Sequence, residues 1–391
     1  MQKKLHEGKA VFFASVSDIV NAGMGVFYNP VMRFSRDISV LLLDAIHTSG
    51  SRGLRVGLPL AGSGVRGLRF LKELPASYVK KVSFNDGNQT ATKAIQRSIR
   101  ENRVASRSNV VNMDANSFLL DSKGFDYIDI DPFGSPMHFL DAAMARISRG
   151  GILALTATDT SALCGSYPKA GMRKYGARPL KGPMMHELAV RILISTALRA
   201  GAVHEKGCSP LIAYSTDHYV RVVLRCEKGR KIADDALQRI GFLAYCPSCL
   251  RRESRRLPNL PEKCICGKAY DYAGPLYLGP FGDCDTLSRM IKSSTRLFPS
   301  DERLHSLLIQ LADEAEVQDV GHFNLHDFAR KGILPSIPRT ADMISMLKKK
   351  HPKSHSCISH TSGVGIRTDA GYDAVAESAL DIFGLSHARR R

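Results

Sequence analysis

The 391-residue sequence contains no tryptophan, and aromatic residues make up only 7% of it. No run approaches the roughly 18 uncharged apolar residues that a membrane-spanning helix needs. The first residues, Met1 to Glu7, lead into no apolar signal-peptide core. These absences argue against a membrane-embedded or secreted protein, so we expect a cytoplasmic chain without membrane contact.

Acidic residues are scarce relative to basic ones: 37 Asp and Glu stand against 55 Lys and Arg, which gives a net charge of +18. The pI is near 9.6. Such an excess favours a polyanionic partner, because Lys and Arg contacts to phosphates release condensed counterions. Nucleic acid is the leading candidate partner, and a device for solubility is the alternative.

The nine cysteines lie in a chain without a secretory signal, so they do not indicate a disulfide framework. Four of them cluster as two pairs, Cys246 with Cys249 and Cys264 with Cys266. This pattern resembles a four-cysteine structural zinc site, in which thiolate ligands replace the core that a small module lacks. Because the second pair is C-x-C instead of C-x-x-C, free buried thiols are the alternative. The arginines that follow predict a basic surface for phosphate contacts, with a solvated loop as the alternative: Arg251, Arg252, Arg255 and Arg256.

From Leu54 to about Arg225, β-rich apolar runs alternate with helical stretches, as in a doubly wound parallel α/β sheet. The predicted strands are 54–60, 79–84, 110–113, 125–130 and 151–158. The predicted helices are 65–74, 89–102, 137–148 and 184–200. Two further apolar runs, 211–215 and 219–225, are joined by so short a link that we expect an antiparallel hairpin.

The sequence predicts two domains. Residues 1–228 would form the sheet domain with an N-terminal extension, including a helix at 36–48 with Ser35 as its N-cap. Residues 229–391 would form a smaller C-terminal α+β domain that carries the cysteine module at 246–267. Within it, a helix at 340–350 and a hairpin at 358–368 around Gly363 and Gly365 suggest a winged-helix-like unit, with a solvated basic face as the alternative.

A glycine-rich segment, 61–67, directly follows the first predicted strand and matches G-x-G-x-x-G through Gly62, Gly64 and Gly67. Glycines permit a tight turn and let a ligand approach backbone N–H groups at a helix N-terminus. Asp86, at the end of the second strand, is placed to accept hydrogen bonds from both ribose hydroxyls of an adenosine cofactor. NAD and S-adenosylmethionine fit these features equally well.

Three later features favour S-adenosylmethionine. Asp114 with Ala115, after the third strand, places an acid beside the expected adenine position. The fourth strand ends in Asp-Pro-Phe, which does not suit hydride transfer, and the closing hairpin is typical of a methyltransferase sheet. Taken singly, Asp86 and Asp114 are also consistent with helix caps or surface acids.

The segment 125–133 predicts a buried strand that ends in an acid, a proline and an aromatic ring. Asp131 and the carbonyl of Pro132 can accept the two hydrogens of a planar exocyclic amine, while Phe133 stacks on its ring. This matters because the amine of guanine is a poor nucleophile, its lone pair being delocalised into the ring. A simple turn is the alternative, but Asp129 and Asp131 share one face of an apolar strand, and buried carboxylates are costly unless paired or used.

Several segments, spread over nearly the whole chain, form a family pattern when taken together. They are Glu7-Gly8-Lys9-Ala10, Val26-Phe27-Tyr28-Asn29-Pro30 running to Arg36-Asp37, Asp129-Ile130-Asp131-Pro132-Phe133-Gly134-Ser135-Pro136, Thr158-Asp159 with Leu163-Cys164-Gly165, Asp217-His218-Tyr219-Val220-Arg221-Val222, and the cysteine module. These segments resemble the tRNA (guanine26-N2)-dimethyltransferase family. The eight-residue signature at 129–136 is highly specific.

The resemblance implies a Rossmann-like class I methyltransferase sheet and a C-terminal domain that binds tRNA. It implies transfer of one or two methyl groups from S-adenosylmethionine to the exocyclic N2 of guanine 26, by a chain that we expect to be a monomer. Asp131 with Phe133 would hold the target guanine. The residues that would contact S-adenosylmethionine are Arg36, Arg66, Asp86, Asp114 and Ala115.

Three other interpretations stay open at this point. The first is an amino-methyltransferase that acts on DNA adenine or on a different RNA guanine, since an Asp-Pro-Phe segment suits any planar exocyclic amine. The second is a zinc-bearing RNA-binding protein whose sheet holds the cofactor without turnover. The third is an NAD-dependent dehydrogenase.

Overall fold

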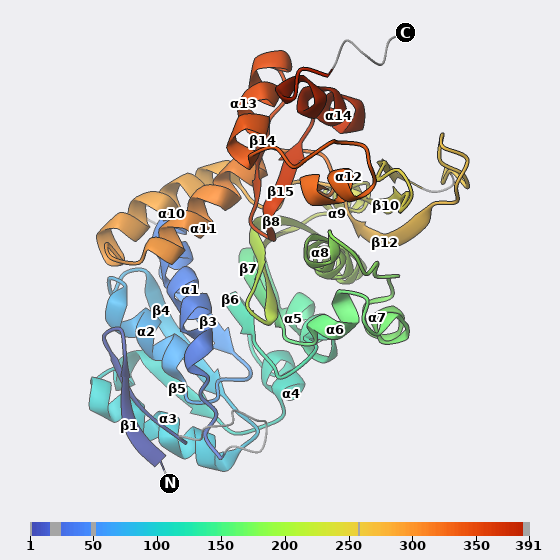
Figure 1. The fold of residues 1–391 in the computed structure, drawn as a ribbon. Helices are drawn as coiled ribbons and strands as arrows, with labels where there is room; N and C mark the ends of the chain where they lie inside the picture. Colours follow the sequence, from blue (N-terminus) through green and yellow to red (C-terminus); the bar gives the residue numbers. More distant parts are fainter. Residues whose placement is uncertain (1, 16–24, 48–51, 257–258, 386–391) are drawn as a thin grey trace.

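The computed structural model describes residues 2–15, 25–47, 52–256 and 259–385 (Figure 1). At the centre of the described chain lies a seven-stranded sheet with the order β5-β4-β3-β6-β7-β9-β8. Neighbours among β3 to β7 pair in parallel, whereas β9 is antiparallel to both β7 and β8. The predicted doubly wound sheet with a closing hairpin is confirmed.

All predicted strands of this sheet are present. Their bounds are β3 Leu54–Leu58, β4 Val79–Asn85, β5 Ser108–Val111, β6 Phe125–Ile130, β7 Ile147–Ala157, β8 Lys206–Thr216 and β9 Tyr219–Lys228. Several boundaries differ from the prediction: β8 begins at Lys206 instead of 211, and β7 begins at Ile147 instead of 151. The helix predicted at 137–148 ends at Arg146, because the β-branched Ile147 already pairs with Phe125 at the start of β7.

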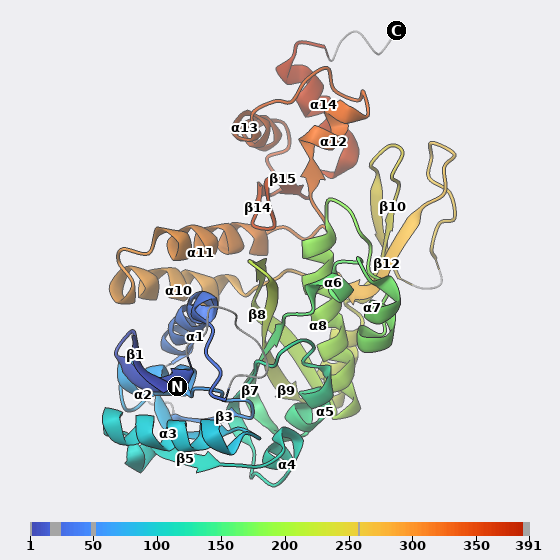
Figure 2. The ribbon, with the colours of Figure 1, turned by 60° about the horizontal axis from the view of Figure 1, so that its bottom comes forward.

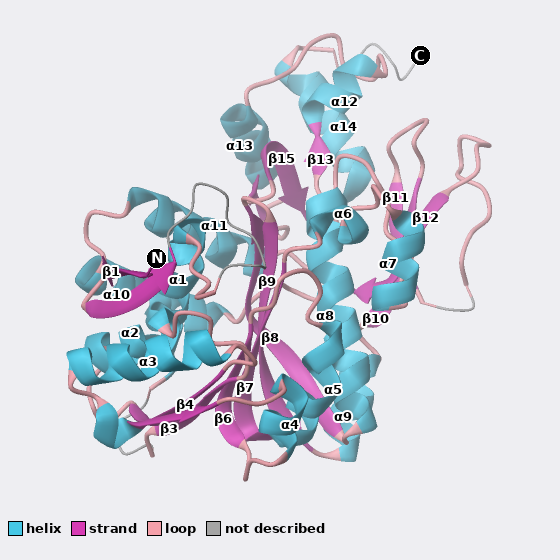
Figure 3. Cartoon of the chain, turned by 90° about the horizontal axis from the view of Figure 1, so that it is seen from below, coloured by secondary structure: helices cyan, strands magenta, loops and turns pink. Residues whose placement is uncertain are grey.

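Helices cover both faces of the sheet (Figure 3). One face carries α1 Arg33–Ile46, α2 Val65–Glu73 and α3 Gln89–Asn102; the other carries α4 Ala115–Leu120, α5 Met137–Arg146 and α8 Met185–Val203. Two short helices, α6 Thr160–Leu163 and α7 Pro168–Tyr175, follow β7. Strand residues alternate between two apolar cores, so that Tyr127 packs on the α1 side and Ile128 on the α8 side.

The N-terminal boundary of α1 differs from the prediction. A 3-10 turn at Pro30–Met32 precedes the helix, and the side chain of Asn29 caps it by accepting the Val31 N–H. Proline suits the first position of a helix, since its missing N–H would have no partner there. Ser35 is therefore a buried residue within α1 and not its N-cap. The predicted end at Thr48 lies outside the described residues.

An N-terminal hairpin, β1 Gln2–Glu7 and β2 Ala10–Ser15, packs against α2 and α3. Phe12 and Ala14 of β2 are fully buried in the same core as α1. The predicted N-terminal extension is thus part of the sheet domain's core.

The C-terminal part contains two small sheets. The first has the order β11-β10-β12, with β10 Ile240–Tyr245, β11 Arg252–Arg255 and β12 Asp271–Tyr277. The second has the order β13-β15-β14, with β13 Phe323–Asn324, β14 Ser356–Ser359 and β15 Ser362–Thr368. The helices are α9 Arg230–Leu237, α10 Cys284–Leu297, α11 Glu302–Ala315, α12 Leu325–Arg330, α13 Thr340–Lys350 and α14 Gly371–Ile382.

Figures 1 and 2 show α12, α13 and α14 at the end of the molecule opposite to α3. By contrast, α10 and α11 lie beside α1, and Leu287 and Leu304 share its core. Leu243 and Leu276 likewise share the core beneath α8. The predicted boundary coincides with the end of β9 at Lys228, but apolar contacts continue across it, and the division into two domains stays a prediction.

The helix and hairpin predicted near the C-terminus exist as α13 and β14–β15, but most of the hairpin is buried or half-buried and only Gly363 and Val364 are exposed. Its turn is His360-Thr361, while Gly363 and Gly365 lie inside β15. The His360 side chain is fully buried against Glu314 of α11, because a buried carboxylate requires donors.

The arginines after the first cysteine pair do not all form the predicted basic surface. Arg252 turns inward, its Nε donates to the Val320 carbonyl at 2.8 Å, and its guanidinium lies 3.4 Å from the Phe323 ring centroid. Loss of water around Arg252 lowers its pKa to about 10. Arg251 forms an ion pair with Asp373.

None of the helices in the described ranges combines the length and the apolar character needed to cross a membrane.

Gly67 in α2 tests the packing of that helix on the sheet. A Cβ there would lie 2.4 Å from Cε1 of Phe84 and 2.7 Å from Cδ1 of Leu58. We expect Gly67→Ala to lower the free energy of unfolding by about 1–3 kcal/mol through overpacking, measured by chemical denaturation. The control is Gly363→Ala, whose Cβ would meet no heavy atom within 4 Å and should leave stability unchanged. Equal stability of the two variants would contradict this packing.

Candidate active site

The carboxyl ends of β3, β4, β6 and β7 face a cavity of about 760 Å³. A smaller cavity of about 60 Å³ lies next to it, under the glycine-rich loop. The residues that line both are Phe27, Asn29, Arg36, Leu60, Gly62 and Asp131. Open α/β sheets bind their ligands at this edge.

The glycine-rich loop forms the predicted turn between β3 and α2. Gly62 has φ +54°, and a Cβ there would lie 3.1 Å from the Phe27 carbonyl oxygen. Its N–H donates to Oδ2 of Asp86 at 2.8 Å. Gly64 has φ +75° and is the N-cap of α2, but it lines neither cavity. Of the two glycines assigned to the cofactor, Gly62 therefore meets the cavity and Gly64 shapes the turn.

Asp86 lies at the end of β4, as predicted, and lines the larger cavity. Both of its oxygens accept backbone hydrogen bonds, from Gly62 N–H and from Asn88 N–H at 2.9 Å. Burial raises the pKa of Asp86, and these two donors act in the opposite direction. The carboxylate thus holds the loop as well as facing the cavity.

Asp114 is the N-cap of α4, which was the alternative considered for it. Its Oδ1 accepts the N–H groups of Asn116 at 2.9 Å and Ser117 at 3.0 Å. Ala115 begins α4, and neither residue lines either cavity. A contact of Asp114 or Ala115 with a cofactor stays a prediction.

A buried chain of charges runs beneath the end of β6. Arg221 of β9 donates to both oxygens of Asp129, at 2.8 and 2.6 Å. Arg66 of α2 lies 3.5 Å from Asp129 and donates through its Nη2 to Asp131. Tyr127 adds a hydrogen bond of 2.7 Å to Asp129. Burial opposes ionisation of Asp129, but Arg221 and Arg66 outweigh it and lower the pKa to about 2.

The two acids of β6 therefore differ in environment. Asp129 is 3% exposed and fully paired. The Asp131 side chain is 24% exposed and lines both cavities while Arg66 holds one of its oxygens. Among the described residues, none donates a hydrogen bond to the other oxygen, Oδ1. The structure brings Asp131 to the cavity, where the sequence predicted it.

Pro132 and Phe133 also line the larger cavity. A reciprocal pair of hydrogen bonds holds the loop after them: Gly134 N–H donates to Thr158 Oγ1 at 2.7 Å, and Thr158 N–H donates to the Gly134 carbonyl at 2.9 Å. The Phe133 ring is about half exposed and meets the Phe27 ring edge to face, with centroids 4.2 Å apart. Residue chemistry pointed to Phe133 alone, because nothing local marks Phe27 as more than one aromatic residue in a loop.

Arg36 lines both cavities, although only the family resemblance identified it. Its Nε donates to Glu7 at 2.7 Å and its Nη2 pairs with the other Glu7 oxygen at 2.5 Å. Glu7 also pairs with Arg69 at 3.0 Å. Burial favours the neutral acid, but the two arginines outweigh it and lower the pKa of Glu7. The N-terminal hairpin is thereby fixed to the cavity wall.

Three further lining residues escaped the residue-by-residue prediction: His138, Lys174 and His218. Lys174 forms an ion pair of 2.9 Å with Asp159. His138 lies at the start of α5, and His218 lies in the turn between β8 and β9. They come from elements far apart in the sequence, so only the fold brings them to one cavity.

The predicted cysteine cluster forms. The sulfur atoms of Cys246, Cys249, Cys264 and Cys266 all lie within 4.8 Å of one another. Two sulfur pairs are closer: Cys246 and Cys266 at 3.6 Å, and Cys249 and Cys264 at 3.4 Å. The C-x-C spacing therefore does not prevent the second pair from joining the first.

Comparison with known proteins establishes the family. Residues 6–379 match the family described as N2,N2-dimethylguanosine tRNA methyltransferase. The chain belongs to this family. It is 36% identical to the tRNA (guanine(26)-N(2))-dimethyltransferase of Methanosphaera stadtmanae over 93% of each chain. It is 33% identical to the tRNA (guanine(26)-N(2)/guanine(27)-N(2))-dimethyltransferase of Aquifex aeolicus, over 97% of this chain and 96% of that protein.

A solved structure shows the same arrangement over the whole length. Trm1 from Pyrococcus horikoshii, solved with S-adenosyl-L-methionine, is 30% identical, with a TM-score of 0.82 over 96% of this chain and 99% of that one. The expected family, the Rossmann-like methyltransferase fold and the class of enzyme, an S-adenosylmethionine-dependent tRNA guanine-N2 methyltransferase, are thereby confirmed.

The buried charge chain predicts different costs for substituting its two acids. Removing one partner of a buried ion pair costs about 3–5 kcal/mol, so we expect Asp129→Asn to lower the free energy of unfolding by about that amount. Asp131→Asn, at the cavity surface, should cost less than half as much. Chemical denaturation of both variants measures this, and equal losses would contradict the distinct roles.

The loss of stability caused by Asp129→Asn should depend on pH. The pKa of Asp129 is about 2 in the folded chain and about 3.9 in an unfolded one. Ionised Asp129 therefore makes its full contribution to the free energy of unfolding above about pH 4. It is lost as the pH falls toward 2. The difference in unfolding free energy between wild type and Asp129→Asn should shrink over that interval, and a constant difference would contradict the assignment.

Proposed function

We propose that this chain transfers one or two methyl groups from S-adenosylmethionine to the exocyclic N2 of guanine 26 in tRNA. The observation that carries the proposal is the Asp131 carboxylate, which Arg66 holds at the lip of the cavity with Oδ1 open to it. Family membership and the names of the relatives support the position in tRNA.

The residues around the two cavities fit S-adenosylmethionine. We assign the ribose hydroxyls to Asp86, and the close approach of the cofactor to the loop at Gly62, where any side chain would crowd Phe27. Arg36 and Arg66 line the smaller cavity and offer positive charge for the carboxylate of the methionine moiety. When bound, S-adenosylmethionine supplies a methyl carbon on a positively charged sulfur; each transfer would break that carbon–sulfur bond, leave the neutral thioether S-adenosylhomocysteine and release one proton from N2.

The residues at the end of β6 prepare the amine. Asp131 Oδ1 and the Pro132 carbonyl accept the two hydrogens on N2, which favours a pyramidal nitrogen whose lone pair is no longer delocalised into the ring. Phe133 stacks on the guanine base. Phe27, which packs against the Phe133 ring, limits lateral movement of the base. Arg66, itself held by Asp129, keeps the Asp131 carboxylate oriented toward the cavity. Positioning is therefore most of the catalytic task.

We extend the proposal to a structural Zn²⁺ held by the four cysteines and to tRNA binding by residues 229–391. Tetrahedral thiolates at about 2.3 Å from zinc lie about 3.8 Å apart, close to the 3.4 and 3.6 Å between the nearest sulfur pairs. The site would fix the loops that follow β10, where the buried cluster formed by the described residues is small: Ala244, Cys246, Cys264 and Tyr270.

The function is tested by mass spectrometry of nucleosides after incubation of an unmodified tRNA transcript with the protein and S-adenosylmethionine. We expect N2-methylated and N2,N2-dimethylated guanosine from the wild type and a loss of at least about a hundredfold in rate for Asp131→Ala, because its hydrogen bonds to N2 form only in the productive complex. Binding of tRNA should be unchanged. An inactive wild type would instead support a non-catalytic RNA-binding protein.

A second candidate is methylation of guanine 27 in addition to guanine 26, which the name of the Aquifex aeolicus relative favours. Transcripts with adenine at position 26, at position 27, or at both separate the two. Modification that persists on the first transcript and disappears on the third would assign guanine 27 as well.

Metal content tests the cysteine site. The purified wild type should contain about one zinc per chain, and Cys266→Ser, which removes one of four ligands, should lose most of it together with several degrees of thermal stability. Cys284→Ser, at an exposed cysteine outside the cluster, is the matched control and should retain the metal. Equal zinc content in both variants would rule out Cys266 as a ligand.

A further inference from the structure

The turn between β8 and β9 forms one wall of the larger cavity. Its two residues are Asp217 and His218, and His218 with the following Tyr219 lines the cavity. Asp217 has φ +50°, in the left-handed region that aspartate adopts more readily than most residues other than glycine. Contacts from the C-terminal part of the chain reach this turn and the strand before it.

Arg303 of α11 provides the first contact. Its Nη2 donates to the Asp217 carboxylate at 2.8 Å and to the Thr216 hydroxyl at 2.9 Å. Its guanidinium lies 4.4 Å from the ring centroid of Phe34 in α1. Arg303 thus contacts two adjacent residues on the β8 side of the turn and itself packs against α1, the helix that carries Arg36 to the cavity.

His360, in the turn between β14 and β15, provides the second contact. Its Nε2 accepts the N–H of Ser215 at 3.3 Å. Since β8 is an edge strand, no neighbouring strand pairs with that side of it. Because Nε2 accepts, Nδ1 carries the hydrogen and donates to Glu314 at 2.8 Å, and the His360 backbone N–H donates to the other Glu314 oxygen at 2.5 Å.

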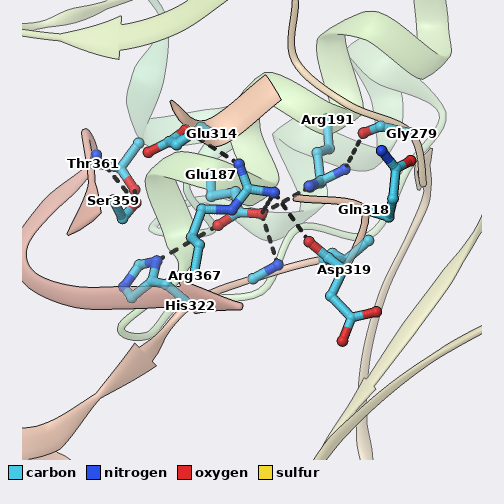
Figure 4. A network of polar contacts seen from close by, with 12 residues as sticks. Glu187, Arg191, Gly279, Glu314, Gln318, Asp319, His322, Ser359, Thr361 and Arg367 are labelled. Carbon is cyan, nitrogen blue, oxygen red and sulfur yellow. Dashed lines mark hydrogen bonds and ion pairs between the residues drawn. The ribbon is translucent and has the colours of Figure 1, made fainter. Parts of the chain in front are cut away.

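Glu314 belongs to the buried charge network of Figure 4. Arg367 donates to Glu314 at 3.1 Å and to the Asp319 carbonyl at 3.0 Å, and it lies 3.9 Å from Glu187 of α8. Glu187 pairs with Arg191 at 2.9 Å within the same helix. The side chains in this network are buried, so the turn that carries His360 is fixed to the sheet domain and not only to its own small sheet.

We propose that Arg303 and His360 are positioning residues, which hold the β8–β9 turn so that His218 forms a hydrogen bond with the target nucleotide. This rests on the proposed function. Lys174 and Asp86, which share the cavity wall, already have partners, whereas His218 has none among the described residues. Its exposed imidazole can donate or accept a hydrogen bond at the edge of a base or at a ribose hydroxyl.

The proposal makes the C-terminal part more than a surface for tRNA. Its helix α11 and its β14–β15 turn contact the end of β8 and thereby set the position of one cavity wall. Within the sheet domain alone, this wall is only the turn at the end of an edge strand. A misplacement of about 1 Å at a catalytic wall costs up to a hundredfold in rate. We therefore expect the effect of losing this support in the rate of methyl transfer and not in tRNA affinity.

Steady-state methylation of tRNA by Arg303→Met tests this, with Arg296→Met as the control. Arg296 of α10 is a similarly exposed arginine that forms an ion pair with an aspartate, Asp44, so both variants lose the same charge and one ion pair. We expect kcat of Arg303→Met to fall on the order of tenfold with little change in KM for tRNA, and Arg303→Lys to recover part of it. Arg296→Met should keep the wild-type kcat.

A double-mutant cycle provides the second readout. If Arg303 acts through the turn, His218→Gln should lower kcat much less in the Arg303→Met background than in the wild type, since residues that act as a unit are not additive. Additive effects, or a change in KM alone that Arg296→Met reproduces, would overturn the inference while leaving the function intact. A wild type that methylates no guanine 26 would overturn both.

Discussion

The arrangement of the active site depends on a buried alternation of two aspartates and two arginines under the end of β6. Arg221 neutralises Asp129, and Arg66 lies between Asp129 and Asp131. The Asp129 carboxylate is therefore fully paired inside the protein. The Asp131 carboxylate is held at the cavity, with Oδ1 open to it. Without the pair of Asp129 and Arg221, Arg66 would keep only Ser39 as an anchor from which to orient Asp131, and a buried charge would lack its partner.

This interaction also explains how distant segments meet at one site. Arg66 comes from the helix after the first sheet strand and Arg221 from the strand of the closing hairpin, while Ser39 of α1 accepts hydrogen bonds from both. The central sheet order places β9 two strands away from β6, with β7 between them. The hairpin is thus joined to the same chain of charges as Asp131, and α11 and the β14–β15 turn contact the hairpin from the C-terminal part.

Much of this was predictable from the sequence. Hydrophobic alternation gave the strands, the glycine-rich segment gave the first turn, and Asp131 was placed correctly because an acid that ends a buried strand must face either a partner or a cavity. Local sequence pattern did not predict the position of side chains whose partners lie far away in the sequence. Arg252 and His360 look like exposed basic residues in a loop or turn, yet Val320 and Glu314 draw them inside. Phe27 carried no local signal, and the cofactor contact of Asp114, which caps α4, stays a prediction.

A crystal structure of the protein with S-adenosylhomocysteine and tRNA would test the central claim most directly. The decisive quantity is the distance from Asp131 Oδ1 to N2 of guanine 26. The account predicts a hydrogen bond of about 3 Å, with Arg66 still between Asp129 and Asp131. A base whose N2 faces other residues, with Asp131 turned away from the cavity, would contradict it.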